Sequence, residues 1–444
     1  MAKVLILAYD FPPYVSVGGL RPYSWYKYLH EFGIYPVVVT RQWDNKYGNH
    51  LDYVTPGKST ETIIEKSEKG TIIRTPYFPN LSNKLLLNYG ESRFKLIRKV
   101  ITAYYEFAQF LFFIGPKSQL YFAAKKFLAS DKVDVIIATG DPFILFRYAS
   151  KLSDLYNIPW IADYRDPWTQ NANTVNNMAL RIRNTLLEKK YLKNVNAIST
   201  VSTLLVNQIG TLLPDKTFHL IPNGYDPENV DKAKEVSQGS KKLSIAYVGT
   251  IFNWSPLDSF LRVCCQFIKK NNAKFQINFY GVNAEDEIKH LIQSKYKELL
   301  PVLSIYPKMP HEQLLIELAS NNLFLLFNYY NYTSTKIYEY LALKRMILLC
   351  YSNDPEANEL KKKYYHLKED ESEGKYLQAD LINETNSGIV VKDAAHLSTI
   401  LEELYHEFEK TGFISCNTVN AERHSRKNQV QKLAEVIKLS VNKE

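Results

Sequence analysis

Short apolar runs alternate along the chain with longer segments whose apolar residues recur at helical spacing. In the first half of the chain, these runs lie at 3–8, 36–40, 133–138, 159–163 and 197–201. A continuous apolar run suits a strand that is covered on both faces, so each run predicts a strand of a parallel sheet. The alternation of strands with helices therefore predicts an α/β fold.

The alternation stops near the middle of the chain and then restarts. Residues 226–242 are charged and poor in large apolar side chains, which is typical of an interdomain linker. Further apolar runs follow at 243–248, 275–280, 303–306, 323–327 and 346–350. We predict two doubly wound, Rossmann-like domains facing across a cleft, with ligands at the carboxyl ends of their strands. The predicted bounds are 1–226, a linker at 227–242, 243–420, and a C-terminal helix at 421–444 that returns to the N-terminal domain.

One segment of the second domain, 333–349, is predicted to form a loop, a short helix and a buried strand. Three hydroxyl residues are suited to cap the helix: Thr333, Ser334 and Thr335. The amides and dipole at the helix start, with the Lys336 ammonium beside them, form a candidate diphosphate site. Glu339, one turn further on, could accept hydrogen bonds from sugar hydroxyls. The alternative is an ordinary capped helix with Lys336 and Glu339 in solvent.

Loops at the predicted strand ends contain the other candidate residues. They are Gly18, Gly19, Arg21, Asp141, Arg165, Asp166, Gly249 and Thr250. The glycine pair would let a ligand approach the backbone, or could form a plain turn; neither a GxGxxG nor a P-loop motif is present. Arg165 is suited to bidentate contact with phosphate, or to an internal network with Asp166. Asp141 lies beside Pro142, where a carboxylate that only caps a turn is an equal alternative.

The charge of the chain points to an anionic partner. The net charge is +9 and the isoelectric point is near 9.0, which fits a phosphate-bearing substrate, nucleic acid or anionic lipid. Residues 81–130 hold eight Lys or Arg and two Glu, interleaved with aromatic residues. This pattern is typical of helices at an anionic membrane surface, or of core helices with a solvated basic edge. No recognition helix or RNA-binding motif supports nucleic acid, so we expect none.

The spacing of the histidines and cysteines does not predict a metal site or a redox site. The nine histidines and four cysteines show no metal-ligand spacing and no disulfide framework, so we predict no metal site. No secretory leader or membrane-spanning segment is expected from the apolar pattern. The free cysteines fit a reducing cytoplasm. We therefore expect a cytoplasmic protein, with the inner face of the cytoplasmic membrane as a further expected location.

Several segments, in a consistent order, resemble the GT-B glycosyltransferases, specifically their large retaining family 4 group. The segments are FPPYVSVGGLR, DVIIATGDPF, ADYRDPW, EKKYLKNVNAISTVS, IPNGYD, LSIAYVGTI and TSTKIYEYLALKRMIL. The resemblance covers nearly the whole chain. It implies that a sugar moves from a nucleotide donor, bound by the second domain, to an acceptor bound by the first.

The resemblance also implies roles for individual residues. Glu339 matches the glutamate that holds the donor's ribose, and Lys336 with the amides of Ser334 and Thr335 matches the diphosphate region. Gly18 and Gly19 match the glycine loop near the diphosphate and the transferring sugar, and Asp141 falls where relatives contact that sugar. The sequence departs from the family at Asn331, where the family has its first glutamate, and at Lys344, where it has glycine. We add Gly249 and Thr250 to the donor side, Arg21 and Asp166 to the acceptor side, and Asp141, Arg165 and Lys336 as catalytic.

These features favour a retaining glycosyltransferase whose catalysis is mainly electrostatic and positional. It would need no metal and no cofactor, because the nucleotide sugar is a co-substrate. The acceptor would be a glycan or a polyprenyl-linked glycan in polysaccharide synthesis, with an anionic membrane surface as a further partner. Two alternatives stay open: a sugar-nucleotide epimerase of similar fold, and a non-catalytic subunit that binds nucleotide sugars.

Overall fold

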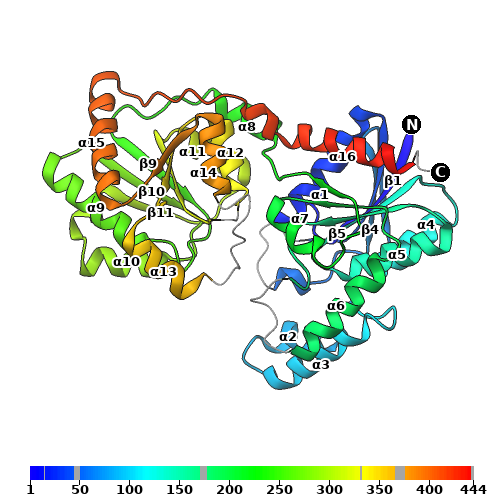
Figure 1. Ribbon diagram of the computed structural model, residues 1–444. Coiled ribbons are helices and arrows are strands. Elements are labelled where there is room, and N and C mark those ends of the chain that lie inside the picture. The colour runs from blue at the N-terminus through cyan, green and yellow to red at the C-terminus, as the bar shows by residue number, and fades with distance from the viewer. Residues whose placement is uncertain (15, 45–50, 171–177, 331–332, 366–375, 442–444) are drawn as a thin grey trace. The chain divides into compact units, whose positions relative to one another are not determined.

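The computed structural model describes residues 1–14, 16–44, 51–170, 178–330, 333–365 and 376–441. Position 331, where the family's first glutamate is missing, lies outside these residues. The chain forms two compact units, each an α/β fold with a largely parallel sheet (Figure 1). Unit 1 comprises Met1–Asn223 and Arg426–Glu444, and unit 2 comprises Gly224–Ser425.

Unit 1 is built on an eight-stranded sheet in the order β3-β4-β2-β1-β5-β6-β7-β8. Its strands are β1 (Ala2–Leu7), β2 (Ile34–Arg41), β3 (Ile63–Ser67), β4 (Gly70–Thr75), β5 (Val135–Gly140), β6 (Trp160–Tyr164), β7 (Ala197–Thr200) and β8 (Phe218–Leu220). Every pairing is parallel except that of β3 with β4. Its helices are α1 (Val17–Tyr28), α2 (Leu81–Tyr89), α3 (Lys95–Ala108), α4 (Ser118–Leu128), α5 (Ile144–Tyr156), α6 (Met178–Leu192), α7 (Thr203–Gly210) and α16 (Arg426–Val441).

The central strand β1 shows why the apolar runs are continuous. Val4 and Ile6 point to one face of the sheet, into a core shared with Trp25 of α1. Leu5 and Leu7 point to the other face, into a core shared with residues of α4 and α5. All four strand residues are fully buried. Because successive side chains alternate between two covered faces, every position must be apolar.

The C-terminal helix α16 returns to unit 1, as the sequence predicted. Leu433 and Ile437 are fully buried in the same core as Trp25. Lys427, in the first turn of α16, forms an ion pair with Glu31 at 2.6 Å. The helix therefore covers one face of the sheet beside α1 and completes the core of unit 1.

Unit 2 has a six-stranded, wholly parallel sheet in the order β11-β10-β9-β12-β13-β14. Its strands are β9 (Leu243–Val248), β10 (Phe275–Tyr280), β11 (Leu303–Tyr306), β12 (Leu323–Phe327), β13 (Met346–Cys350) and β14 (Gly388–Val391). Its helices are α8 (Pro227–Lys234), α9 (Leu257–Asn271), α10 (Glu285–Ser294), α11 (His311–Ala319), α12 (Lys336–Leu343), α13 (Pro355–Tyr364), α14 (Leu377–Thr385) and α15 (Ala394–Thr411). The strand order is that of a doubly wound sheet, which confirms the predicted fold class.

The segment predicted to be a linker begins with a packed helix instead. The Asp226 carboxylate accepts a hydrogen bond from the Glu228 amide and so caps α8, and Pro227 occupies its first turn. Val230 and Ala233, one turn apart, are buried in the core of unit 2. The prediction was wrong because two small apolar residues at helical spacing suffice to bury one side of a short helix.

Helix α12 is followed by its C-cap residue, Lys344, which adopts φ 52° and ψ 45°. A side chain in this left-handed conformation costs about 1 kcal/mol, which glycine avoids. Lys344→Gly is expected to raise the midpoint of thermal unfolding by about 2–4 °C, a shift that corresponds to about 1 kcal/mol in a unit of this size. Lys344→Ala, which keeps Cβ, is the control in the same calorimetric scan. Equal midpoints for the glycine and alanine variants would contradict this account.

Candidate functional site

The sheet of unit 2 reverses its strand order between β9 and β12, and ligands of such folds bind beyond the carboxyl ends of the two strands at this point. Gly249 and Thr250 follow β9. Gly249 has φ +84°, a conformation that glycine adopts without strain. The Thr250 carbonyl accepts hydrogen bonds from the hydroxyls of Tyr247 and Tyr329, the latter at 3.2 Å. These bonds fix the turn after β9 against the end of β12.

Lys336, in the first turn of α12, reaches the same place. Its ammonium lies 4.0 Å from the centre of the Tyr247 ring and donates a hydrogen bond to the Tyr329 hydroxyl at 3.1 Å. Burial lowers the pKa of Lys336 to about 7. The structure therefore brings Lys336 and Thr250 together through two tyrosines. It holds there a desolvated amine whose charged form an anionic ligand would stabilise.

The start of α12 differs from the predicted capped helix. Thr335 is the N-cap residue, but its side chain makes no capping hydrogen bond. The buried Ser334 hydroxyl oxygen has no hydrogen-bond partner among the described atoms. The predicted hydroxyl cap by these two residues is therefore wrong. Because α12 makes no side-chain cap at Thr335, its first amides are suited to an external acceptor.

Glu339 lies one turn further along α12 and is buried. His311, the first residue of α11, contacts the Glu339 carboxylate through Nε2 at 2.7 Å. This contact orients the carboxylate at the end of the sheet. His311 could not be selected from the sequence, because it precedes Glu339 by 28 positions and belongs to no motif.

In unit 1 the strand order reverses between β1 and β5, and a second cluster lies there. Arg165, after β6, donates from Nε to the Gly140 carbonyl at 2.8 Å and from Nη2 to the Asp141 carbonyl at 2.7 Å. A Cβ atom on Gly18 would lie 2.2 Å from Arg165 Nη1 and 2.8 Å from Asp10 Oδ2. The structure therefore brings together Gly18, Asp141 and Arg165, as the sequence predicted for strand-end loops.

Asp10 is a member of this cluster that sequence reasoning did not select. Its Oδ2 accepts a hydrogen bond from the Ser16 hydroxyl at 3.0 Å, and its buried Oδ1 has no partner among the described atoms. Burial raises the pKa of Asp10, which Ser16 and Arg165 oppose by lowering it. The signal that could have found Asp10 is its position directly after the first buried strand, in the loop that leads to Gly18.

Three other predicted residues have different surroundings. The Gly19 amide donates to the Ser16 hydroxyl at 3.1 Å, so it serves as part of the cap of α1. Asp166 is exposed next to Arg165. Arg21 is buried: its Nη2 lies 2.8 Å from Asp163, and its Nη1 donates to the Ile221 carbonyl.

The prediction of an acceptor contact at Arg21 was wrong. Asp163 also accepts hydrogen bonds from the hydroxyls of Thr139 and Ser199, so the Arg21–Asp163 pair is the centre of a buried network across three strands. A buried ion pair of this kind is stable only when its remaining donors and acceptors are satisfied, as they are here. Arg21 thus joins α1 to the sheet and is occupied by these contacts.

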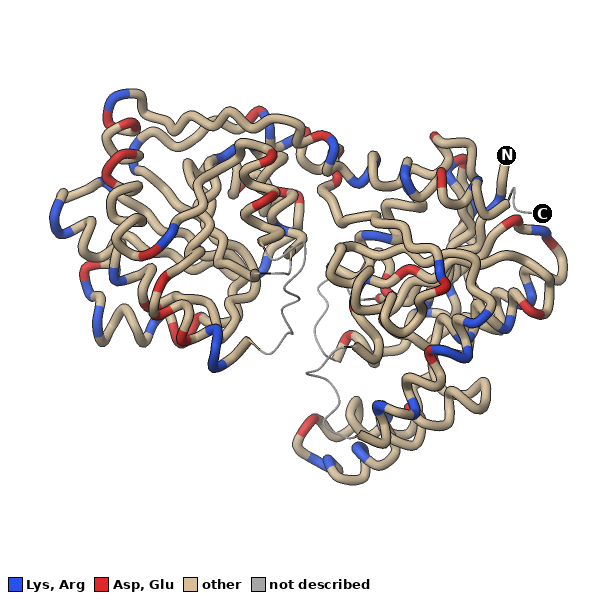
Figure 2. Tube along the Cα trace, in the orientation of Figure 1, with Lys and Arg blue, Asp and Glu red and all other residues tan. Residues whose placement is uncertain are grey.

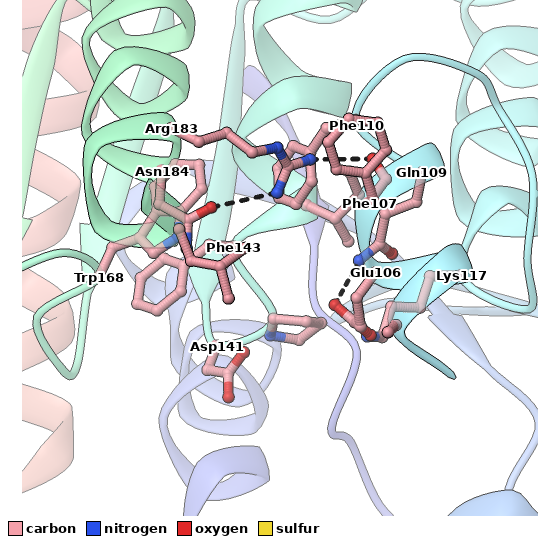
Figure 3. Close-up of a pocket in the computed structure, with 14 residues that line it drawn as sticks. Glu106, Phe107, Gln109, Phe110, Lys117, Asp141, Phe143, Trp168, Arg183 and Asn184 are labelled. Atoms are coloured by element: carbon pink, nitrogen blue, oxygen red, sulfur yellow. Dashed lines mark hydrogen bonds and ion pairs between the residues drawn. The ribbon is translucent and has the colours of Figure 1, made fainter. Parts of the chain in front are cut away.

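A pocket of about 280 Å³ opens beside Asp141 in unit 1 (Figure 3). Its aromatic lining includes Phe110, Phe143 and Trp168, the last two with parallel rings 5.2 Å apart. The Arg183 guanidinium, from α6, lies 4.3 Å from the centre of the Phe107 ring and donates to the Phe107 carbonyl at 2.9 Å. The pocket thus joins the end of β5 to helices α3 and α6.

The outer face of α3 is apolar and exposed. Leu96, Val100 and Tyr104 are 76%, 64% and 60% exposed, and Met178 and Leu186 of α6 are also exposed. Basic residues accompany these helices (Figure 2) and include the exposed Arg93, Lys95 and Lys99. No helix within the described part of the chain is long and apolar enough to cross a membrane.

The titratable residues of the described segments offer no metal centre. No three His, Cys, Asp or Glu side chains among them come together as metal ligands. The four cysteines are free thiols, and burial raises the pKa of each. The positive charge at the two strand-end clusters comes from Lys336 in unit 2 and Arg165 in unit 1.

Comparison with known proteins identifies the fold. No protein-family model matches the chain, and no curated protein matches its sequence. Solved structures do match. A sucrose-phosphate synthase from Thermosynechococcus elongatus aligns at a TM-score of 0.56 and 16% identity, over 99% of this chain and 97% of the other. An α,α-trehalose-phosphate synthase (UDP-forming) from Burkholderia xenovorans, in complex with glucose-6-phosphate, aligns at 0.58 and 11%, over 98% and 100%.

The catalytic domain of starch synthase IV from Arabidopsis thaliana, bound to ADP and acarbose, aligns at 0.53 and 12%, over 100% of this chain and 99% of the other. These structures are glycosyltransferases of the GT-B fold. At such identities the likeness establishes the fold, and the chain has the GT-B fold, which confirms the fold that the sequence resemblance implied.

Proposed function

We propose that the protein is a retaining glycosyltransferase that moves a sugar from a nucleotide-sugar donor to a glycan or lipid-linked acceptor. The observation that carries this proposal is the Lys336 cluster: a buried lysine meets the start of α12, whose N-cap residue Thr335 makes no side-chain capping bond, at the strand-order reversal of unit 2. This is the chemistry that a diphosphate requires. The starch synthase of the same fold is a structure with bound ADP, which supports a nucleotide-linked donor.

The donor would bind unit 2, where different residues would hold its diphosphate and its ribose. Lys336, the amides at Ser334 and Thr335, and the turn at Gly249 and Thr250 would hold the diphosphate. Glu339, oriented by His311 at 2.7 Å, would accept hydrogen bonds from the ribose hydroxyls. We propose no metal and no cofactor, since the ammonium and the helix amides supply positive charge to the leaving diphosphate.

In the proposed reaction, the bond from the anomeric carbon to the donor phosphate breaks as the acceptor hydroxyl attacks from the same side. The hydroxyl proton passes to the phosphate oxygen that leaves, so no strong protein base is required. Asp141, Arg165 and Gly18 belong to the strand-end cluster of unit 1, where the acceptor would bind. Asp141 would contact the transferring sugar, and exposed Asp166 would lie on the acceptor side.

A screen of nucleotide sugars by thermal shift tests the donor proposal. A donor at 100 times its dissociation constant should stabilise the protein by about 2.7 kcal/mol. Transfer of radiolabel from that donor to a lipid or glycan extract should follow. Conversion of the donor without an acceptor would instead favour an epimerase, and binding without any turnover would favour a non-catalytic subunit. Absence of binding to every nucleotide would overturn the proposal.

We further propose that α3 and α6 place the protein on an anionic membrane surface, at the cytoplasmic face where nucleotide sugars are available. Their exposed apolar residues would enter the headgroup region while Arg93, Lys95 and Lys99 meet the lipid phosphates. An acceptor carried by a lipid would then lie beside unit 1.

The triple variant Arg93→Gln, Lys95→Gln, Lys99→Gln is expected to bind phosphatidylglycerol vesicles about 100-fold more weakly. Each basic residue near an anionic surface contributes about 1 kcal/mol, so three contribute about 3 kcal/mol. Co-sedimentation with vesicles measures the change. The control removes three exposed lysines of unit 2, Lys269, Lys270 and Lys289, and should bind as the wild type does. Equal losses in both triple variants would contradict docking through α3.

A further inference from the structure

The pocket beside Asp141 extends from the strand-end cluster of unit 1 to the apolar face of α3 and α6. Figure 3 shows Asp141 on one side and Arg183 on the other. Phe107 and Leu180 also line the pocket, and both side chains are about half exposed on the outer faces of α3 and α6. The pocket is thus continuous with the apolar face of these helices at one end and with the strand-end cluster at the other.

The lining of the pocket fits a sugar ring. The rings of Phe110, Phe143 and Trp168 supply apolar faces. Glu106, which accepts a hydrogen bond from the Gln109 amide at 2.6 Å, supplies a carboxylate at the edge of the pocket. Aromatic faces with a few oriented polar groups are typical of small-molecule sites, and about 280 Å³ is near the lower end of their volumes, roughly 300 Å³.

Arg183 lies where the pocket meets the apolar face. Its guanidinium is held by the Phe107 ring at 4.3 Å, by the Phe107 carbonyl at 2.9 Å and by Asn184 Oδ1 at 3.3 Å. A guanidinium fixed at such a boundary is suited to a phosphate group, because it offers several donors in one plane. A phosphate that joins a sugar to a lipid would lie at the same kind of boundary.

We propose that this pocket binds the sugar of a glycosyl phospholipid acceptor, with Arg183 at the phosphate and the lipid chain leaving across the apolar face of α3 and α6. The inference rests on the proposed glycosyl transfer and narrows its acceptor to one chemical class. Asp141, at the other side of the pocket, then faces the sugar hydroxyl that is to be glycosylated. The lipid stays in the membrane while its sugar reaches the strand-end cluster.

Binding of short synthetic amphiphiles tests the pocket. The probes are glucosyl octyl phosphate, octyl glucoside and glucose 1-phosphate, all below micellar concentrations, with dissociation constants from ligand-observed NMR. The octyl phosphate probe is expected to bind at least tenfold more tightly than the other two. Ala103→Trp, at an exposed position that lines the pocket, should weaken it at least tenfold. Leu155→Trp places the same indole at the far end of α5 and should leave binding within twofold.

A second variant separates the phosphate contact from the shape of the pocket. Arg183→Gln should weaken glucosyl octyl phosphate at least tenfold and leave uncharged octyl glucoside within twofold. Undiminished binding in Ala103→Trp, or equal losses for both probes in Arg183→Gln, would overturn the inference. Donor binding in the same samples, by thermal shift, reports on the proposed function separately. If no donor binds but the probes still bind the pocket, only the proposed glycosyl transfer is overturned. If the donor is turned over but the probes do not bind the pocket, only the acceptor class is overturned.

Discussion

Replacing Lys336 by methionine is expected to lower kcat for sugar transfer by about 10²–10³-fold, the usual loss when a fixed electrostatic stabiliser of a leaving group is removed. The ammonium is held 4.0 Å from the centre of the Tyr247 ring and 3.1 Å from the Tyr329 hydroxyl, so it is poised before the donor arrives. Initial rates at saturating donor measure the effect. Lys344→Met, which removes an exposed charge from the end of the same helix, is the control and should change kcat less than twofold.

The same residue predicts the pH dependence of donor binding. Burial lowers the pKa of Lys336 to about 7 in the free protein, and a bound diphosphate would raise it. Above pH 7, binding must therefore take up a proton, so the dissociation constant of the donor should rise by up to tenfold per pH unit. Titration calorimetry between pH 6 and 9 measures this slope. A wild-type slope that persists in Lys336→Met would contradict the assignment.

The folded state should become less stable as the pH falls, whereas donor binding becomes tighter. Because the pKa of Lys336 is lowered from 10.5 by folding, the charged lysine disfavours the folded state. This cost is absent above pH 10.5, grows as the pH falls toward 7, and is complete below 7. Lys336→Met removes it and should unfold at a higher temperature at pH 6. A loss of activity with a gain of stability would separate catalysis from folding.

The fold followed from the sequence because its main determinant is local. In β1, Leu5 is buried in the core on one face of the sheet and Ile6 in the core on the other. The same continuous run of apolar residues recurs at each central strand. The apolar pattern did not predict helix α8, because the buried side of this helix consists of Val230 and Ala233. Short helices with small buried residues look like linkers when composition alone is considered.

The candidate site was predictable only in part. The strand-end rule placed Thr250, Asp141 and Arg165 in loops that follow strands, where the structure has them, because carboxyl ends of parallel strands meet at one edge of a sheet. The same rule does not predict which side chain a given residue pairs with. Arg21 pairs with Asp163 across 142 positions, and His311 pairs with Glu339 from another helix. Such pairings depend on the tertiary arrangement, and no spacing in the sequence encodes them.

Gly18→Ala is expected to lower the rate of transfer by about 10²-fold while leaving the fold intact. The new Cβ would lie 2.2 Å from Arg165 Nη1, so the guanidinium must move and lose its bonds to the Gly140 and Asp141 carbonyls. A displacement of about 1 Å in a positioning group costs rates of this order. Gly18 lies in the first turn of α1, where alanine favours the helix by up to about 1 kcal/mol, so thermal stability should not fall.

A double-mutant cycle decides whether the effect passes through Arg165. Arg165→Ala should by itself lower kcat by about 10²-fold or more, since it removes a fixed positive charge. If Gly18→Ala acts by displacing that guanidinium, adding it to Arg165→Ala should cost less than a further twofold, because the group it displaces is already absent. Multiplicative losses would instead show that Gly18 acts through Asp10, whose Oδ2 would lie 2.8 Å from the new Cβ, or through direct approach of a ligand to its backbone. The cycle therefore distinguishes a glycine kept for Arg165 from a glycine kept for Asp10 or for the substrate.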